Sequence, residues 1–266
     1  FYLKIIMLKK KNKSIKILVL VTAYNVENFL ESVLNKIPKS IKKYNTQILI
    51  YDDASDDKTY KKALKLKKKK KYNINIIRNK KNLGYGGSQK AGYSYAIKNN
   101  FDYVALLHGD GQYAPEKLPE LLNEIINKKY DAVFGSRMIN KKDAIKGGMP
   151  FYKFIGNIIL TKIQNFLLGT KLSEFHSGYR VYNVRSLKKI PFLLNSNSYN
   201  FDTEIIVQFK LVNFKIKEIA IPTFYGKEIS YLNGIEYACN ILINTFTGSL
   251  HRFGFKYQKK FNLKKK

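Results

Sequence analysis

The 266-residue sequence predicts an α/β fold with a mostly parallel central sheet flanked by helices. Apolar runs of strand length recur through the first half of the chain, and stretches with helical periodicity separate them, as in βαβ units. Hydrophobic residues make up 45% of the chain and charged residues 26%, a composition that can bury one substantial core. Because we find no internal repeat and no Pro/Gly/Ser-rich linker, we expect one continuous domain.

Five apolar runs predict the strands of the first half: residues 17–21, 47–51, 74–77, 103–107 and 132–134. Helical patterns follow the first run, over residues 26–37, and the third run, over residues 86–99, while a lysine-rich helix follows the second run. Ligands of parallel sheets bind beyond the carboxyl ends of the strands. The segments that directly follow these runs are therefore the expected place for a site.

The second half of the chain is less regular. Apolar residues recur at helical spacing over 151–169 and over 235–253, and residues 178–182 predict a short strand. We expect three regions: a basic N-terminal extension over 1–14, the main domain over 15–230, and an amphipathic, basic C-terminal helix and tail over 231–266.

The formal net charge is +30, from 49 Lys and Arg against 19 Asp and Glu. Only five of these cations are Arg, and many Lys lie in runs such as 67–71 and 264–266, which favours a solvated, lysine-biased surface. Attraction to an anionic membrane surface is the second interpretation. Nucleic acid is the least favoured partner, because such a protein would interleave Arg with aromatic residues, whereas the polar motifs here follow strand ends.

The single cysteine, Cys239, cannot form an internal disulfide or a thiolate metal cage, and this indicates a reducing compartment. No stretch approaches the roughly 18 consecutive apolar residues of a spanning helix. The start of the chain, residues 1–7, is too short for the apolar region of a signal peptide. We expect a cytoplasmic protein, with peripheral attachment to the cytoplasmic face of the membrane as a further option.

Acidic residues follow the second strand, in the segment Asp-Asp-Ala-Ser-Asp-Asp at 52–57. Adjacent carboxylates directly after a buried strand suit hydrogen bonds to a base or ribose, with metal binding as the lesser alternative. Ser55, Asp56 or Asp57 could instead cap the following helix. We assign the ligand-binding role first to Asp53.

A glycine cluster, Gly84, Gly86 and Gly87, follows the third strand. It is similar to a phosphate-binding turn, but its spacing fits neither a P-loop nor the dinucleotide fingerprint. The alternative is a tight strand-to-helix connection that needs positive φ.

The segment His-Gly-Asp-Gly-Gln at 108–112 follows the fourth strand. The Asp110 carboxylate is a good ligand for Mg²⁺ or Mn²⁺, which would neutralise a diphosphate leaving group. His108 and Gln112 lie two residues away on either side. His108 is either structural or a second ligand, and Mn²⁺ tolerates imidazole better than Mg²⁺ does.

Arg137 and Arg180 stand out because Arg is scarce, and each follows a turn of small residues that contains Ser136 or Ser177. Their planar forks suit bidentate contacts with phosphate, while an ordinary ion pair with a carboxylate is the alternative. Glu204 is either a base or a residue in the first turn of a helix.

The order of these motifs resembles family 2 glycosyltransferases, especially the dolichol-phosphate mannose synthase-like branch. Asp52, Asp53, Ser55, Asp57 and Thr59 match Asp-Asp-x-Ser-x-Asp-x-Thr; Asn82 and Gly84 match Asn-x-Gly; Asp110 and Gln112 match Asp-x-Asp-x-Gln; residues 135–137 and 177–180 match Gly-Ser-Arg and Ser-Gly-(Phe/Tyr)-Arg. The chain departs from the family in two places: His108 replaces the first Asp of the metal motif, and residues 22–26 read Thr-Ala-Tyr-Asn-Val where the family has Pro-x-Tyr-Asn-Glu. The resemblance covers residues 15–221.

The resemblance implies a Rossmann-like glycosyltransferase A-type fold and inverting transfer of a sugar from a UDP- or GDP-linked donor to a polyprenyl phosphate. It places the donor nucleotide over Thr22, Ala23, Tyr24, Asn25, Asp52, Asp53, Gly84 and Asp110; Mg²⁺ or Mn²⁺ on Asp110 with Gln112 and His108; and the acceptor phosphate on Ser136, Arg137, Ser177 and Arg180.

A saccharide hydroxyl acceptor, as in cell-surface polysaccharide synthesis, is the rival within the family. Such an acceptor needs a general base, and Glu204, Asp202 and His176 are the candidates. From other classes, a basic nucleic-acid-binding domain and a non-catalytic nucleotide-binding domain are the alternatives, the latter because of His108. The helices expected over 151–169 and 235–253 either dock on the membrane interface or complete the core.

Overall fold

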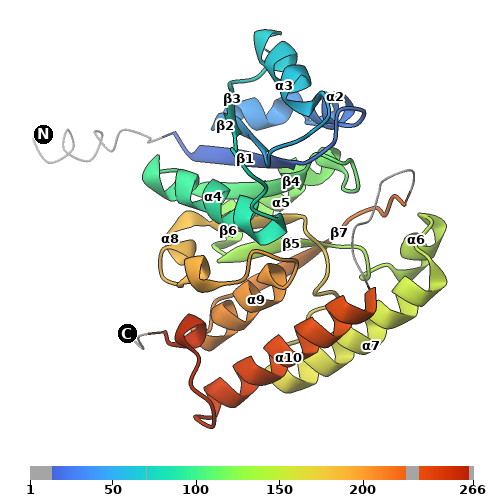
Figure 1. Ribbon diagram of the computed structural model, residues 1–266, viewed down its shortest axis with the longest axis vertical. Helices are drawn as coiled ribbons and strands as arrows, with labels where there is room; N and C mark the ends of the chain where they lie inside the picture. The colour runs from blue at the N-terminus through green and yellow to red at the C-terminus, as the bar shows by residue number, and fades with distance from the viewer. Residues whose placement is uncertain (1–13, 70, 226–233, 264–266) are drawn as a thin grey trace, which may run out of the picture.

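The computed structural model describes residues 14–69, 71–225 and 234–263. Their strands form one seven-stranded sheet in the order β3-β2-β1-β4-β6-β5-β7 (Figure 1). The strands are β1 (Lys16–Ala23), β2 (Asn45–Asp52), β3 (Ile74–Arg78), β4 (Tyr103–His108), β5 (Ala132–Ser136), β6 (Arg180–Asn183) and β7 (Ile216–Ala220). β6 runs antiparallel to β4 and β5, and the other pairs are parallel, so the expected mostly parallel sheet is confirmed.

Helices cover both faces of the sheet. They are α2 (Leu30–Lys36), α3 (Thr59–Lys68), α4 (Tyr85–Lys98), α5 (Leu118–Lys128), α6 (Lys141–Lys146), α7 (Phe151–Leu168), α8 (Val184–Leu187), α9 (Phe201–Leu211) and α10 (Gly234–Arg252). Alternate residues of β1 point to opposite faces. Val19 and Val21 join the core under α2, α3 and α5, whereas Leu18 and Leu20 join the core under α4, α8 and α9.

The five strands expected in the first half are all present, each longer than expected by one to three residues. The helix expected over 26–37 begins only at Leu30. The reason is a tertiary contact: the backbone N–H groups of Val26 and Glu27 donate to the side chains of Thr59 and Asp57 (2.8 and 3.0 Å), which holds this segment in a turn.

The C-terminal helix α10 packs against α7 and α9, and Phe261, which follows it, joins the core under α4, α8 and α9. Helix α10 runs beside α7, with the Ser249 hydroxyl donating to the Leu167 carbonyl (2.8 Å), and Phe261 beyond it is buried. The expected boundary near residue 230 falls outside the described residues, as does the N-terminal extension apart from Ser14. None of the helices in the described ranges combines the length and apolarity that crossing a bilayer requires.

Candidate functional site

Most of the expected motif residues lie at one end of the sheet, where the parallel strands have their carboxyl ends; we call this end the rim. Ala23 at the end of β1 pairs with Asp52 of β2, and Thr22 pairs with His108 of β4. Because β6 runs the opposite way, its first residue, Arg180, lies at this same rim beside β4 and β5. The topology therefore brings together segments that are up to 158 residues apart in sequence, counted from Thr22 to Arg180.

The loops after β1 and β2 are locked to each other. Three backbone N–H groups of the first loop donate to side chains of the second: Asn25 to Ser55 (3.0 Å), Val26 to Thr59 (2.8 Å) and Glu27 to Asp57 (3.0 Å). The Asn25 side chain returns the contact by accepting from the Asp56 N–H (2.9 Å). Most of the acidic motif thus shapes the β1 loop, and this loop presents Tyr24 at the surface with 37% of its area exposed.

The two carboxylates after β2 have different surroundings. Asp52 is fully buried, where Ser55 donates to it and the Arg78 Nε lies 3.2 Å from its Oδ2, so its place is internal rather than at the expected nucleotide surface. Asp53 accepts from the backbone N–H groups of Leu83 (2.8 Å) and Gly84 (3.0 Å). Asp53 therefore holds the loop after β3 against the rim.

The glycine cluster forms a tight strand-to-helix connection instead of a phosphate turn. Gly84 has φ +79°, and a Cβ there would lie 2.8 Å from the Asn197 carbonyl oxygen. The same carbonyl accepts from the N–H of Gly86 (2.7 Å). The N-terminus of α4 is thus covered by the segment around Asn197.

His108 ends β4 with its ring between two tyrosines, Tyr85 (centroids 5.5 Å apart) and Tyr113 (5.0 Å), both edge-on. Burial lowers the pKa of His108, and the neighbouring Asp110 charge opposes this shift. The Asp110 carboxylate accepts from the Gln112 N–H (3.0 Å), which fixes the turn. Asp110 and His108 are thus close enough to interact.

Within the described ranges, no three His, Cys, Asp or Glu side chains come together as a complete metal site. A cation held by Asp110 and His108 would therefore need further ligands, and substrate phosphate oxygens can complete the coordination, as is usual for Mg²⁺. One carboxylate, one imidazole and one amide form a donor set that Mn²⁺ also accepts.

Arg180 is fully buried, in contrast to the expected phosphate contact. Its Nε donates to the Ser177 carbonyl (2.8 Å), its Nη2 donates to the Phe175 carbonyl (2.8 Å), and its Nη1 lies 3.5 Å from Asp202. The Asp202 carboxylate also accepts from the Tyr85 hydroxyl (2.7 Å). Arg180 therefore braces the loop that precedes it, and the ion-pair alternative describes its place.

Arg137 pairs with Glu174, a residue that the sequence did not single out. The Glu174 carboxylate accepts from the Arg137 backbone N–H (2.8 Å), from its Nε (3.0 Å) and from its Nη2. Asn157 of α7 adds a fourth donor (2.9 Å). Burial alone would lower the pKa of Arg137, but the Glu174 charge and hydrogen bond, together with Tyr113 and Tyr225, outweigh burial and raise this pKa well above its usual range. Arg137 is 9% exposed, and the Ser136 hydroxyl beside it contacts Ser173 inside the protein.

The three candidate bases are engaged or neutral. Glu204 pairs with Lys260 (2.7 Å) and accepts from the Ser196 N–H, in the first turn of α9. Asp202 is occupied as described above. Burial lowers the pKa of His176 to about 4, and its Nδ1 lies 3.0 Å from the Tyr237 hydroxyl of α10.

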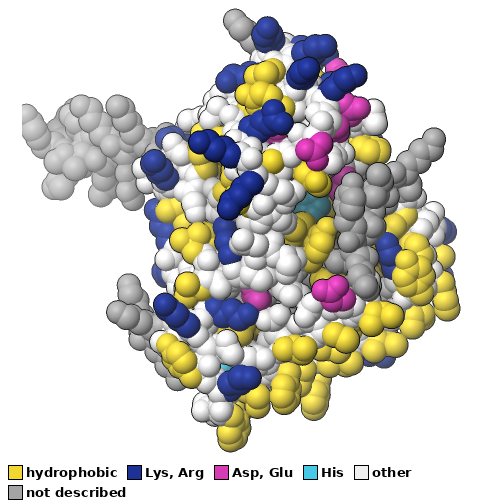
Figure 2. Space-filling model, viewed as in Figure 1, with side chains coloured by type: hydrophobic (Ala, Val, Ile, Leu, Met, Phe, Trp, Pro, Cys, Tyr) yellow, Lys and Arg dark blue, Asp and Glu magenta, His cyan; other side chains and the backbone are white. Residues whose placement is uncertain are grey.

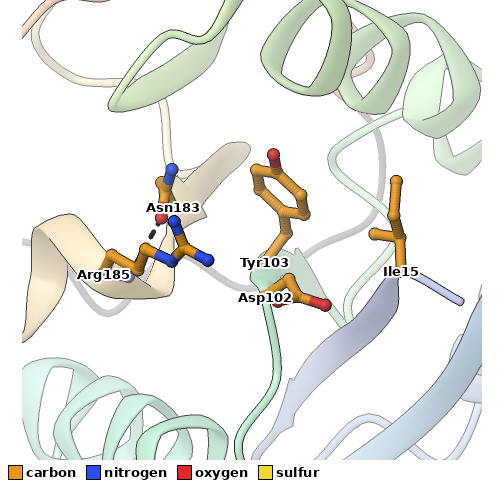
Figure 3. A pocket seen from close by; sticks show the side chains of 5 residues that line it. All are labelled: Ile15, Asp102, Tyr103, Asn183 and Arg185. Carbon is orange, nitrogen blue, oxygen red and sulfur yellow. Dashed lines mark hydrogen bonds between the residues drawn. The ribbon is translucent and has the colours of Figure 1, made fainter. Parts of the chain in front are cut away.

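A separate pocket of about 280 Å³ lies at the other end of the strands from the rim, between the amino ends of β1 and β4 and the carboxyl end of β6 (Figure 3). Asp102, Tyr103, Asn183 and Arg185 line it together with Ile15. Because the pocket is away from the carboxyl ends of the parallel strands, it is not part of the rim.

The fold defines the class of protein. The crystal structure of glucosyl-3-phosphoglycerate synthase from Mycobacterium tuberculosis, in complex with Mn²⁺, UDP and glucosyl-3-phosphoglycerate, superposes with a TM-score of 0.61 at 13% identity, covering 92% of this chain and 82% of that one. At this identity the likeness establishes the fold, which is the glycosyltransferase A-type.

The sequence comparisons then give the family. A model described as glycosyl transferase family 2 matches residues 18–191. The UDP-N-acetylglucosamine–dolichyl-phosphate N-acetylglucosaminyltransferase of Methanococcus voltae is 30% identical over 220 residues (79% of this chain, 86% of that one), and the undecaprenyl-phosphate mannosyltransferase of Micrococcus luteus is 24% identical over 215 residues (80% and 85%). The chain belongs to glycosyl transferase family 2.

Proposed function

We propose that this chain transfers a sugar, with inversion, from a UDP- or GDP-linked donor to a polyprenyl phosphate. The observation that carries the proposal is the composition of the rim in a family 2 chain. The Asp110 carboxylate follows β4, and the Arg137 guanidinium follows β5, the strand on the other side of β6. The relatives that name dolichyl and undecaprenyl phosphate support the choice of acceptor.

The donor nucleotide would lie over the interlocked loops after β1 and β2. Tyr24 offers an exposed ring for the base, beside Thr22, Ala23 and Asn25, while Asp53 holds the Gly84 loop at the edge of this surface. Asp52 lies buried under this surface and supports it by accepting a hydrogen bond from the Ser55 N–H, which fixes the turn.

Asp110, with His108 and Gln112, would hold Mg²⁺ or Mn²⁺. A divalent cation there would neutralise charge on the diphosphate leaving group. The chain itself supplies the orientation, because the Gln112 N–H and the two flanking tyrosines fix the carboxylate and the imidazole.

The acceptor phosphate would face Arg137. One phosphate oxygen attacks the anomeric carbon opposite the diphosphate, the new carbon–oxygen bond forms as the bond to the nucleotide breaks, and the electron pair leaves with the nucleoside diphosphate. Attack from the opposite side inverts the anomeric centre. A phosphate oxygen is already anionic and needs no strong base, in agreement with the ion pair that occupies Glu204. Ser177 and Arg180 would shape the loop behind Arg137.

We propose further that the reaction takes place on an anionic membrane surface, to which the outer faces of α7 and α10 attach. Hydrophobic side chains gather along this edge of the molecule (Figure 2). The exposed residues include Phe151, Ile159 and Phe166 on α7 and Ile235, Ile243 and Phe246 on α10, with 51% to 86% of their areas exposed. A second copy of the chain is a poorer occupant than a bilayer, because each copy carries a formal charge of +30.

Transfer assays with a panel of UDP- and GDP-sugars would test the function, with polyprenyl phosphate in detergent and with Mn²⁺, Mg²⁺ or EDTA. We expect metal-dependent transfer to the lipid, and its loss in Asp110→Ala. Donor binding without lipid transfer would indicate a hydroxyl acceptor, and no donor binding would overturn the enzyme proposal.

Vesicle co-sedimentation would test the membrane face. Phe166→Glu should reduce binding to anionic vesicles, whereas Leu64→Glu on α3, a similarly apolar but distant exposed position, should not. Equal binding of both variants would place the attachment elsewhere, and a concentration-dependent dimer lost in Phe166→Glu would assign the face to a second copy.

A further inference from the structure

The ring of His108 is held in one orientation. Tyr85 and Tyr113 contact it edge-on from two sides. On a third side lies Gly178, where a Cβ would come within 2.5 Å of the His108 Cε1 and 2.7 Å of its Nε2. Only glycine leaves room for this edge of the ring, so the Nε2 edge faces Gly178 and Tyr85.

The hydrogen atoms around Nε2 can be assigned from the contacts. The His108 Nε2 lies 3.4 Å from the Tyr85 hydroxyl oxygen, and that hydroxyl donates its single hydrogen to the Asp202 carboxylate (2.7 Å). Asp202 is an acceptor on both oxygens, since Gln89 donates to Oδ1 (3.3 Å) and Arg180 lies 3.5 Å away. With its hydrogen committed to Asp202, the Tyr85 oxygen can only accept from His108.

We propose that Asp202 and Tyr85 fix His108 as the tautomer protonated at Nε2, which leaves the Nδ1 lone pair as the ligand for a divalent cation beside Asp110. The inference rests on the metal site proposed above and deepens it. Tyr85 and Asp202 act as positioning residues, in the way that hydrogen-bond partners of metal-binding histidines select the ligating nitrogen.

A neutral nitrogen in place of the carboxylate expected at this position changes the cation that the site prefers. Imidazole suits Mn²⁺ and later transition metals, whereas Mg²⁺ prefers oxygen ligands and near-ideal octahedral geometry. The replacement of the first Asp of the family motif by His108 would then change the metal that the site prefers without abolishing metal binding.

Nitrogen-15 NMR of the histidine rings in the metal-free protein would test the tautomer directly. The chain contains three histidines, His108, His176 and His251, and His108→Gln assigns the signal. We expect the His108 ring to show a proton on Nε2 and an unprotonated Nδ1. A proton on Nδ1 with an unprotonated Nε2 would overturn the inference.

The role of Tyr85 would be tested by titrating Mn²⁺ alone, followed by the loss of its free-ion EPR signal. Tyr85→Phe keeps the ring and removes the acceptor, so Mn²⁺ affinity should fall by about 10- to 100-fold. Tyr95→Phe is the matched control, since Tyr95 lies on the same helix and its hydroxyl bonds to Gln47 and Asn75. Equal affinities for the two variants would contradict the positioning role.

These measurements need no nucleotide sugar, so the inference and the proposed function can fail separately. An Nδ1–H tautomer in an active transferase overturns only the inference. The expected tautomer and Mn²⁺ binding in a chain that binds no donor overturn only the function.

Discussion

Replacing Glu174 by Gln tests whether a buried ion pair holds Arg137 in place. Glu174 is 2% exposed and accepts from three groups of Arg137 and from Asn157. Gln keeps the length of the side chain and one acceptor oxygen, but it removes the negative charge. It also places an amide N–H₂ where a carboxylate oxygen accepted a hydrogen bond.

The expected loss of stability follows from leaving the Arg137 charge buried without its partner. Removing one member of a buried, hydrogen-bonded pair costs about 3–5 kcal/mol, and the oxygen that Gln retains favours the lower end, about 3 kcal/mol. The pKa of Glu174 is lowered despite desolvation because Arg137 lies against it, in agreement with an ionised pair.

Urea unfolding would measure this loss as a shift of the midpoint at constant slope. The double variant Arg137→Met with Glu174→Gln removes both charges, so its loss should be clearly smaller than the sum of the two single losses. Additive losses, or a loss below about 1 kcal/mol in Glu174→Gln, would refute the argument that the pair holds Arg137.

Three further predictions concern single positions. Gly84→Ala should lower the free energy of unfolding by more than about 1 kcal/mol, because φ is +79° and the Asn197 carbonyl oxygen would lie 2.8 Å from the new Cβ. Gly156→Ala, in the middle of α7, should raise the free energy of unfolding by up to about 1 kcal/mol, because no atom lies within 4 Å of the new Cβ. Urea unfolding of both variants checks this prediction. The pKa of His176 is about 4 in the folded chain against an ordinary 6.5, so the unfolded chain takes up the proton first as the pH falls. The free energy of unfolding should therefore decrease between pH 6.5 and pH 4, by up to about 3 kcal/mol. A His176→Gln variant should lack this part of the pH dependence in urea unfolding. His108→Asp should raise Mg²⁺-supported transfer relative to Mn²⁺-supported transfer, and an unchanged ratio would argue against His108 as a ligand.

The sheet could be predicted from the sequence because its strands are buried on both faces and read as continuous apolar runs. Residues 17–21 and 103–107 are of this kind. The last strand, β7, could not be predicted in this way, because its sequence Ile-Lys-Glu-Ile-Ala is only partly buried at the sheet edge. The antiparallel insertion of β6 depends on a tertiary pairing that local patterns do not encode.

The positions of the motifs were predictable, but the roles of their side chains were less so. Asp52 and Arg180 were expected to contact ligands, and both are buried in contacts with other parts of the chain. Their partners, Arg78 and Asp202, are 26 and 22 residues away, and this distance hides the pairing from any local pattern.

The contribution of Glu174 illustrates the same limit. It precedes His176 in a loop without periodicity, and its one local signal is a carboxylate placed close before the Ser-Gly-Tyr-Arg motif at 177–180. Its partner Arg137 lies 37 residues earlier, after a different strand. Sequence order therefore indicated which segments reach the rim, and the structure showed which of their side chains support the others.

The most direct test of the central claim compares two acceptors that differ only by the phosphate. The purified chain would receive a nucleotide sugar that it binds, together with either a polyprenyl phosphate or the corresponding polyprenol, under identical detergent and metal conditions. We expect sugar transfer to the polyprenyl phosphate, with an inverted anomeric centre in the product, and none to the polyprenol. Equal transfer to both, or transfer only to a saccharide hydroxyl, would show that a phosphate oxygen is not the nucleophile.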